Sequence, residues 1–264
     1  MMSAMNEKFL SIDKIILTQG QTTVNALLFR PPSSKLKDTG YAIFTHGYTS
    51  HKISIFSWAQ KLCDDGVPTL LFDQPGHFTG SFHDVASFED FKSDAPMLFS
   101  HALNKLREAY PNQQQRILVG GHSLGALTSI LAVQNNYFEG LDVYHCGVGF
   151  GVPPEGVTHV FDTPFYQATV KARAELVSKH LAPEIMFPWI KDQKYHLTLS
   201  NHKIHLISGE DDVVVGKEGM ENFAKILEDL GNTVTMDKPK KLGHHLPDMA
   251  GSFIKKYAKK IGLL

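Results

Sequence analysis

The chain has 264 residues, of which 42% are hydrophobic and 20% are charged. These proportions are typical of a soluble globular protein with enough apolar surface for a sizeable core. Its 26 basic and 27 acidic residues give a net charge of -1, so no overall field would draw the protein to nucleic acid or to an anionic membrane. No apolar run approaches the length of a bilayer span, and a transmembrane anchor is therefore not expected.

The two cysteines, Cys63 and Cys146, stand in a predicted helix and a predicted core strand, outside any C-x-x-C motif. The first ten residues contain no basic segment followed by an apolar stretch, because Glu7 and Lys8 interrupt them. We therefore expect a reduced, cytoplasmic setting. Lysines recur at helical spacing over 255–260, which is typical of the solvated face of a last helix.

Short apolar runs alternate with amphipathic segments along most of the chain. The predicted strands cover residues 9–17, 22–30, 41–45, 67–72, 116–120, 143–150, 204–207 and 232–236. The predicted helices cover residues 53–64, 87–110, 126–133, 217–230 and 247–261. This alternation predicts an α/β fold with a mostly parallel, eight-stranded sheet that helices cover on both faces.

Residues 151–201 break the alternation and are too many for a simple connection. They are rich in aromatic residues and show a helical pattern from about 164 to 180. We therefore predict one core domain, residues 1–150 and 202–264, with residues 151–201 inserted after the sixth strand as a helical cap. Phe161, Phe165 and Trp189 are candidate walls of a substrate pocket, although the same aromatics could simply pack the inserted helices onto the sheet.

The pentapeptide Gly121-His122-Ser123-Leu124-Gly125 lies between a predicted strand and a predicted helix. In a G-x-S-x-G turn, the small residues on either side of the serine let the backbone pass close by without a Cβ clash. Such a turn would present Ser123 Oγ to a substrate as a nucleophile. It would also place the Leu124 amide at a helix N-terminus, where a developing oxyanion is stabilised.

A serine hydroxyl needs a histidine base and a carboxylate that holds the imidazole in the right tautomer. Acidic residues follow the seventh predicted strand, and two histidines follow the eighth. The carboxyl ends of parallel strands meet at one edge of a sheet, so these groups can meet Ser123 although they are distant in sequence. The candidate acids are Asp211 and Asp212, with Glu155 and Asp162 after the sixth strand as alternatives, and the candidate bases are His244 and His245.

These features together resemble the serine-nucleophile, esterase-like and lipase-like members of the α/β-hydrolase superfamily, over essentially the whole chain. Thr45-His46-Gly47-Tyr48 is similar to the H-G motif of that family, and Asp73-Gln74-Pro75-Gly76-His77 is similar to its D-x-P-G-H segment. The family usually continues with G-x-S, whereas this chain continues Phe78-Thr79-Gly80-Ser81. The order of nucleophile, acid and histidine along the chain also agrees with this family.

The resemblance implies which residues form the site. The backbone amides of Tyr48 and Leu124 would form the oxyanion hole. A G-x-x-D-x-x-V register selects Asp212 over Asp211, and a Gly-His pair before the last helix selects His244 over His245. His46 and His77 are expected to be structural hydrogen-bonding groups.

These observations predict a serine hydrolase, with a carboxylesterase (EC 3.1.1) as the first choice and short or medium acyl esters as its small-molecule substrates. A thioesterase, an amide or peptide hydrolase, a carbon–carbon bond hydrolase or an acyltransferase could use the same triad, and a non-catalytic ligand receptor could share the fold. We expect no metal and no cofactor, because the histidines lack metal-binding spacing and there is no phosphate loop or dinucleotide fingerprint.

Overall fold

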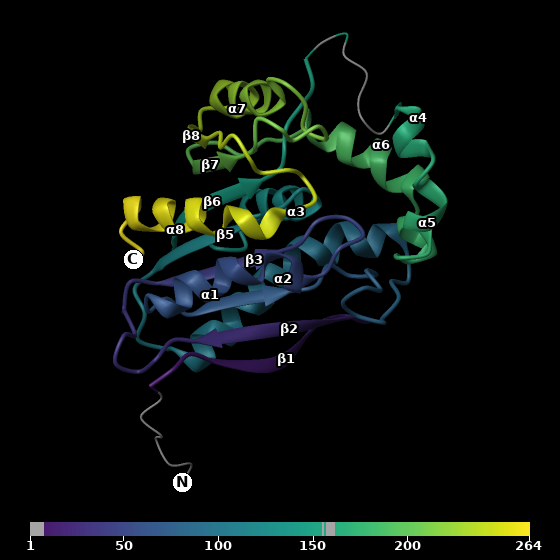
Figure 1. Ribbon diagram of the computed structural model, residues 1–264. Helices are drawn as coiled ribbons and strands as arrows, with labels where there is room; N and C mark the ends of the chain where they lie inside the picture. The colour runs from purple at the N-terminus through teal and green to yellow at the C-terminus, as the bar shows by residue number, and fades with distance from the viewer. Residues whose placement is uncertain (1–7, 155, 157–161) are drawn as a thin grey trace.

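The computed structural model describes residues 8–154, 156 and 162–264. Eight strands form one sheet in the order β1-β2-β4-β3-β5-β6-β7-β8 (Figure 1). They are β1 Ser11–Gln19, β2 Thr22–Arg30, β3 Tyr41–Thr45, β4 Thr69–Phe72, β5 Arg116–His122, β6 Asp142–Val148, β7 Lys203–Ile207 and β8 Thr233–Asp237. β1 and β2 pair antiparallel, β2 pairs antiparallel with β4, and the strands from β4 to β8 run parallel. The predicted fold class is confirmed.

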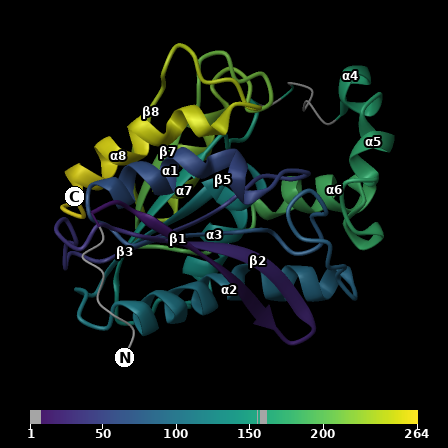
Figure 2. The same ribbon diagram turned by 60° about the horizontal axis from the view of Figure 1, so that its bottom comes forward.

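Helices cover both faces of this sheet (Figure 2). One face carries α1 Phe56–Asp64 and α8 Gly251–Lys260, and the other carries α2 Phe88–Ala109, α3 Leu124–Gln134 and α7 Gly219–Asp229. Every residue of β3 and β4 is therefore buried. In β3, Ile43 belongs to the core beneath α2 and α3, and the next residue, Phe44, belongs to the core beneath α1 and α8. Strands that are buried on both faces appear in a sequence as continuous apolar runs.

The sequence also places most of the element ends within two residues of those in the structure. The sequence predicts that Ser87 opens α2, and its hydroxyl accepts a hydrogen bond from the Asp90 amide at 3.0 Å, which is an N-terminal cap. Two predicted helices each begin with a short 3-10 turn, at Lys52–Ile55 before α1 and at Pro247–Ala250 before α8.

The helical pattern expected from about 164 to 180 does not form one continuous helix. The chain there forms α4 Pro164–Gln167, α5 Val170–Ala174 and the 3-10 turn Lys179–Leu181, and α6 Pro183–Gln193 follows. Backbone pairing with a distant loop competes with the helix. The Phe78 amide donates to the Leu176 carbonyl at 3.0 Å, and the Ser178 amide donates to the Gly76 carbonyl at 2.8 Å. These segments, between β6 and β7 in sequence, lie together at one end of the sheet (Figures 1 and 2).

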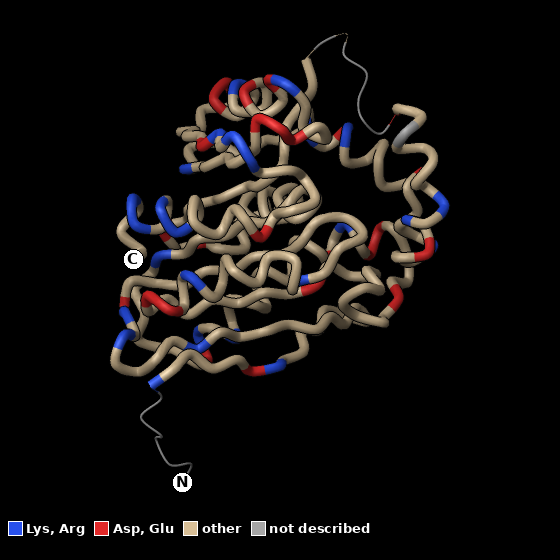
Figure 3. Tube along the Cα trace, viewed as in Figure 1, with Lys and Arg blue, Asp and Glu red and all other residues tan. Residues whose placement is uncertain are grey.

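Charged residues of both signs are interspersed over the chain (Figure 3). Two lysines of α8 form ion pairs, Lys255 with Asp65 at 2.8 Å and Lys256 with Asp237 at 3.0 Å. Part of the basic run at the C-terminus is therefore neutralised locally. In the described part of the chain, no helix is both long and apolar enough to cross a membrane.

Candidate active site

Ser123 occupies a strained turn between β5 and α3. Its backbone has φ 51° and ψ -111°, values that a residue with a side chain adopts only where its surroundings impose them. The turn packs tightly against β3, because a Cβ on Gly125 would lie 2.5 Å from the Thr45 carbonyl oxygen. The Ser123 amide donates to the Val148 carbonyl at 2.8 Å. These contacts hold the serine at the carboxyl edge of the sheet.

Asp212 and His244 meet at the same edge, in the loops that follow the neighbouring strands β7 and β8. The His244 Nδ1 lies 3.0 Å from Asp212 Oδ2, and both side chains are buried. Asp212 Oδ1 accepts hydrogen bonds from the amides of Val214 and Val215, each at 3.0 Å. Burial raises the pKa of Asp212, but the His244 contact and the two amides outweigh it and hold this pKa below its ordinary value.

The other described candidate acids lie elsewhere, and the other candidate base lines the same cavity as His244. Asp211 is exposed and accepts a hydrogen bond from the Leu242 amide at 2.8 Å, so it orders the loop before the histidines. Asp162 is exposed and pairs with Lys191 at 2.8 Å. His245 is exposed beside His244, and Glu155 lies outside the described residues. Among the described candidate acids and bases, Asp212 and His244 are the two that the structure brings into contact.

Ser123 and His244 line one cavity of about 180 Å³. Between these two described residues the structure has no hydrogen bond from Ser123 Oγ to the imidazole. Contacts of this kind often become short only when a substrate is bound. The cavity is lined by Tyr48, Thr49, Ser50, Ser54, His122, Ser123, Tyr166, Arg173, Phe187, Ile190, His244, His245 and Pro247.

Two backbone amides near Ser123 have no hydrogen-bond acceptor among the described residues. Leu124 is the first residue of α3, where an amide has no partner within the helix. Tyr48 lies in the loop after β3, and the next residue, Thr49, has φ 59°, which is unusual for a β-branched residue. Free amides at a helix N-terminus and in a strained loop are the groups that stabilise an oxyanion in acyl transfer.

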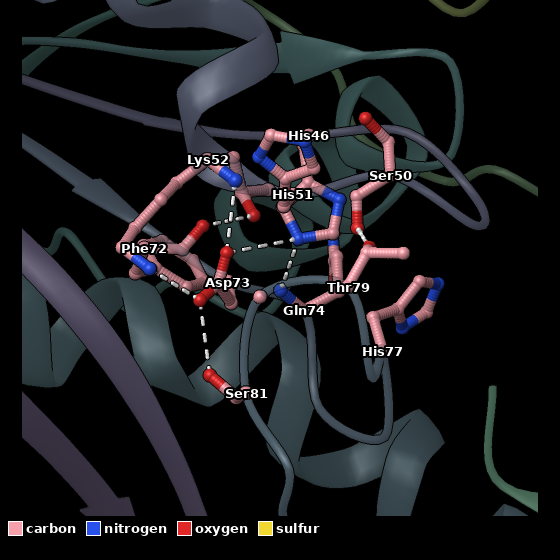
Figure 4. Close-up of polar contacts among 12 residues, drawn as sticks. His46, Ser50, His51, Lys52, Phe72, Asp73, Gln74, His77, Thr79 and Ser81 are labelled. Carbon is pink, nitrogen blue, oxygen red and sulfur yellow. Dashed lines mark hydrogen bonds and ion pairs between the residues drawn. The ribbon is translucent and has the colours of Figure 1, made fainter. Parts of the chain in front are cut away.

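The loop that contains Tyr48 is tied to the end of β4 by the buried carboxylate of Asp73 (Figure 4). Lys52 Nζ donates to Asp73 Oδ2 at 2.6 Å, and the Lys52 amide donates to Oδ1 at 2.8 Å. His46 Nε2 accepts the Gln74 amide at 2.9 Å, and burial lowers the pKa of His46 to about 4, so this imidazole is neutral. Each of these contacts joins the loop after β3 to the loop after β4.

After His77 the chain departs from the family pattern, but the residues that follow still contact the Asp73 carboxylate. The Ser81 hydroxyl donates to Asp73 Oδ2 at 3.0 Å and accepts the Asn25 amide at 2.9 Å. Gly80 passes so close that a Cβ there would overlap the Asp73 carboxylate. Gly80 and Ser81 therefore both contact Asp73, although two residues, Phe78 and Thr79, separate them from His77.

Among the candidate pocket aromatics, Phe161 lies outside the described residues, and Phe165 belongs to α4 but its side chain is not described. Trp189 packs edge-on against Phe88 and Phe91 of α2, with ring centroids 5.8 and 5.9 Å away, and does not line the cavity at Ser123. The aromatic lining there comes from Tyr48, Tyr166 and Phe187.

Sequence reasoning missed three residues at the site. His122 is buried with its ring centroid 4.7 Å from that of His244, and burial lowers its pKa well below the ordinary value. Gly149, after β6, leaves room for both rings, since a Cβ there would lie 3.0 Å from His122 Nε2. Arg173 reaches the cavity from α5. His122 stood inside a recognised motif, but no local pattern marks Gly149 or Arg173.

Within the described ranges, no group of three or more His, Cys, Asp or Glu side chains converges as metal ligands would. The remaining buried histidines have structural contacts instead. His77 Nδ1 lies 2.9 Å from the Pro75 carbonyl oxygen, and His145 Nε2 lies 2.8 Å from Ser129 Oγ. Burial lowers the pKa of each to about 3.

The model of the alpha/beta hydrolase family matches residues 42–220 of the chain. This chain therefore belongs to the α/β-hydrolase family. The sequence has no match among curated proteins.

Solved structures share this fold at low sequence identity. An E-2-(acetamidomethylene)succinate hydrolase has 16% identity and a TM-score of 0.62, with 96% of this chain and 100% of that chain covered. Est1E from Butyrivibrio proteoclasticus has 16% identity and a TM-score of 0.56, with 94% and 98% covered. An acylaminoacyl peptidase from Pyrococcus horikoshii has 13% identity and a TM-score of 0.61. It is a longer protein, and the match covers 97% of this chain and 42% of the peptidase.

Proposed function

We propose that this member of the α/β-hydrolase family is a serine hydrolase that cleaves carboxylic esters through an acyl-enzyme. The observation that carries the proposal is the pairing of Asp212 with His244 at 3.0 Å, on the wall of the cavity that Ser123 also lines. Each of these three residues follows the carboxyl end of a strand, and each is of the type that the chemistry requires.

In this mechanism, His244 takes the proton of Ser123 while the hydroxyl oxygen attacks the ester carbonyl. Asp212 holds the Nδ1 proton of the imidazole, which leaves Nε2 as the base and stabilises the imidazolium that forms. The amides of Tyr48 and Leu124 bind the oxyanion. His244 then protonates the leaving alkoxide, and a water molecule activated by the same imidazole releases the acyl group.

The size of the cavity supports short or medium acyl groups. Its volume of about 180 Å³ is below the range of roughly 300–1,000 Å³ that is usual for drug-sized ligands. We propose further that residues 151–201 act as a cap on a core of residues 1–150 and 202–264. Residues from α4, α5 and α6 contribute Tyr166, Arg173, Phe187 and Ile190 to the cavity wall.

The test combines activity with covalent labelling. Wild-type protein should hydrolyse 4-nitrophenyl butyrate and react with a fluorophosphonate at Ser123, identified by mass spectrometry. Ser123→Ala should lower kcat by roughly six orders of magnitude and abolish labelling without loss of secondary structure. Ser129→Ala, on the same helix but bonded to His145, is the matched control and should label normally. Near wild-type turnover by Ser123→Ala would refute the proposal, and a set of thioesters and amides would separate the acyl classes.

A further inference from the structure

Arg173 is the one permanently charged side chain on the cavity wall formed by the described residues. It is half-buried and comes from α5, in the segment between β6 and β7. The other lining residues supply hydroxyl, imidazole, aromatic and aliphatic groups, and no carboxylate is among them. A single cation in a small cavity attracts anions, because the surrounding protein screens it less than bulk water does.

No described residue supplies a counter-ion for this guanidinium. None of the ion pairs among the described residues includes Arg173. Glu184, an exposed residue of α6, lines a separate cavity. Within the described part of the chain, the Arg173 charge therefore has no carboxylate partner.

The orientation of Arg173 is nevertheless held by several contacts. Its Nε donates to Thr169 Oγ1 at 3.0 Å, its Nη1 donates to Thr49 Oγ1 at 3.1 Å, and the guanidinium lies 4.6 Å from the ring centroid of Tyr166. A guanidinium has five N–H groups, so these two hydrogen bonds leave three donors without an acceptor among the described residues. Such a pre-oriented group with unused donors suits a carboxylate, which can accept two parallel N–H bonds.

We propose that Arg173 determines the substrate specificity of this site, and that the natural acyl substrate carries a carboxylate which pairs with the Arg173 guanidinium. The inference rests on the proposed esterase function and narrows it to half-esters or similar anionic acyl compounds. Since Thr49 is next to Tyr48, an anion bound to Arg173 would also be close to the amide proposed for the oxyanion hole.

The test compares two esters with acyl chains of six carbons, mono-4-nitrophenyl adipate and 4-nitrophenyl hexanoate, each corrected for spontaneous hydrolysis. Wild-type protein should prefer the anionic ester. Arg173→Gln should lower the ratio of kcat/KM for adipate to that for hexanoate by roughly 10- to 100-fold, the loss expected for a charge-assisted hydrogen bond. Arg173→Lys should lower it less. Lys171→Gln removes an exposed charge from the same helix and should leave the ratio unchanged.

A purely structural role gives a different result. If Arg173 only holds the loop through Thr49, then Arg173→Gln and Thr49→Val would lower both activities by the same factor, and the unchanged ratio would overturn the proposal. A binding measurement separates it from the proposed function. By calorimetry, Ser123→Ala should bind monomethyl adipate more tightly than dimethyl adipate. If the wild-type protein hydrolysed neither ester, the esterase function would be rejected. If Ser123→Ala bound the two adipates equally, the role of Arg173 would be rejected.

Discussion

Replacing Lys52 by methionine tests whether the buried ion pair with Asp73 supports the loop that contains Tyr48. The substitution keeps the aliphatic stem of the side chain and removes the ammonium that donates to Asp73 at 2.6 Å. Asp73 is fully buried, so its carboxylate would lose its counter-ion without gaining water. Breaking one partner of a buried pair costs about 3–5 kcal/mol.

The remaining contacts of Asp73 place the expected loss near the lower end of that range. The Lys52 amide at 2.8 Å and the Ser81 hydroxyl at 3.0 Å still donate to the carboxylate. We therefore expect Lys52→Met to lower the free energy of unfolding by about 3 kcal/mol. Ester hydrolysis should also slow, by roughly 10- to 100-fold, because the loop is no longer held in place.

Urea denaturation followed by circular dichroism measures this loss. Lys225→Met, at an exposed position on α7, is the control and should change stability by less than about 0.5 kcal/mol. Lys52→Met with Asp73→Asn removes both charges, so it should be at least about 1 kcal/mol more stable than the sum of the single losses predicts. A Lys52→Met protein as stable as wild type, or strict additivity in the double variant, would refute the reasoning.

Two further predictions concern the triad and the buried histidines. Asp212→Asn should lower kcat for 4-nitrophenyl butyrate by about four orders of magnitude, because the amide cannot hold the required imidazole tautomer. Glu210→Gln, at an exposed position in the same loop, is the control and should match wild type. A loss below about tenfold in Asp212→Asn would exclude Asp212 from the triad. The pKa values of His46, His77 and His145 are lowered in the folded state to about 4, 3 and 3, so below pH 6.5 the unfolded chain binds protons that the folded one does not. Each of these histidines should therefore lower the free energy of unfolding by about 2 kcal/mol between pH 7 and pH 5. Urea titrations at the two pH values should show a loss that is smaller by this amount in His145→Gln than in wild type. Equal losses in the variant and in wild type would contradict this assignment.

Local patterns determined the fold and most of the triad candidates. The largely apolar runs of β3, β4 and β5 and the periodic apolar faces of the helices predicted a two-sided parallel sheet, because strands that are buried on both faces do not alternate between apolar and polar residues. The G-x-S-x-G turn located Ser123, since its glycines are required by the close packing against β3. Strand-end loops and their order narrowed the acid and the base to a few residues each.

Only the tertiary structure decided which of these groups meet. Local periodicity left Asp211 and Asp212 both open, and the resemblance to the family favoured Asp212; only the structure places the Asp212 carboxylate against His244 and the Asp211 carboxylate against the Leu242 amide. The contact between Thr49 and Arg173 joins residues 124 positions apart, and it could not be anticipated from either segment. The same holds for the helix that ends early at α5, because its continuation pairs instead with the backbone around His77. Contacts between distant segments arise only when the sheet brings the segments together, whereas propensity and periodicity act within a few residues.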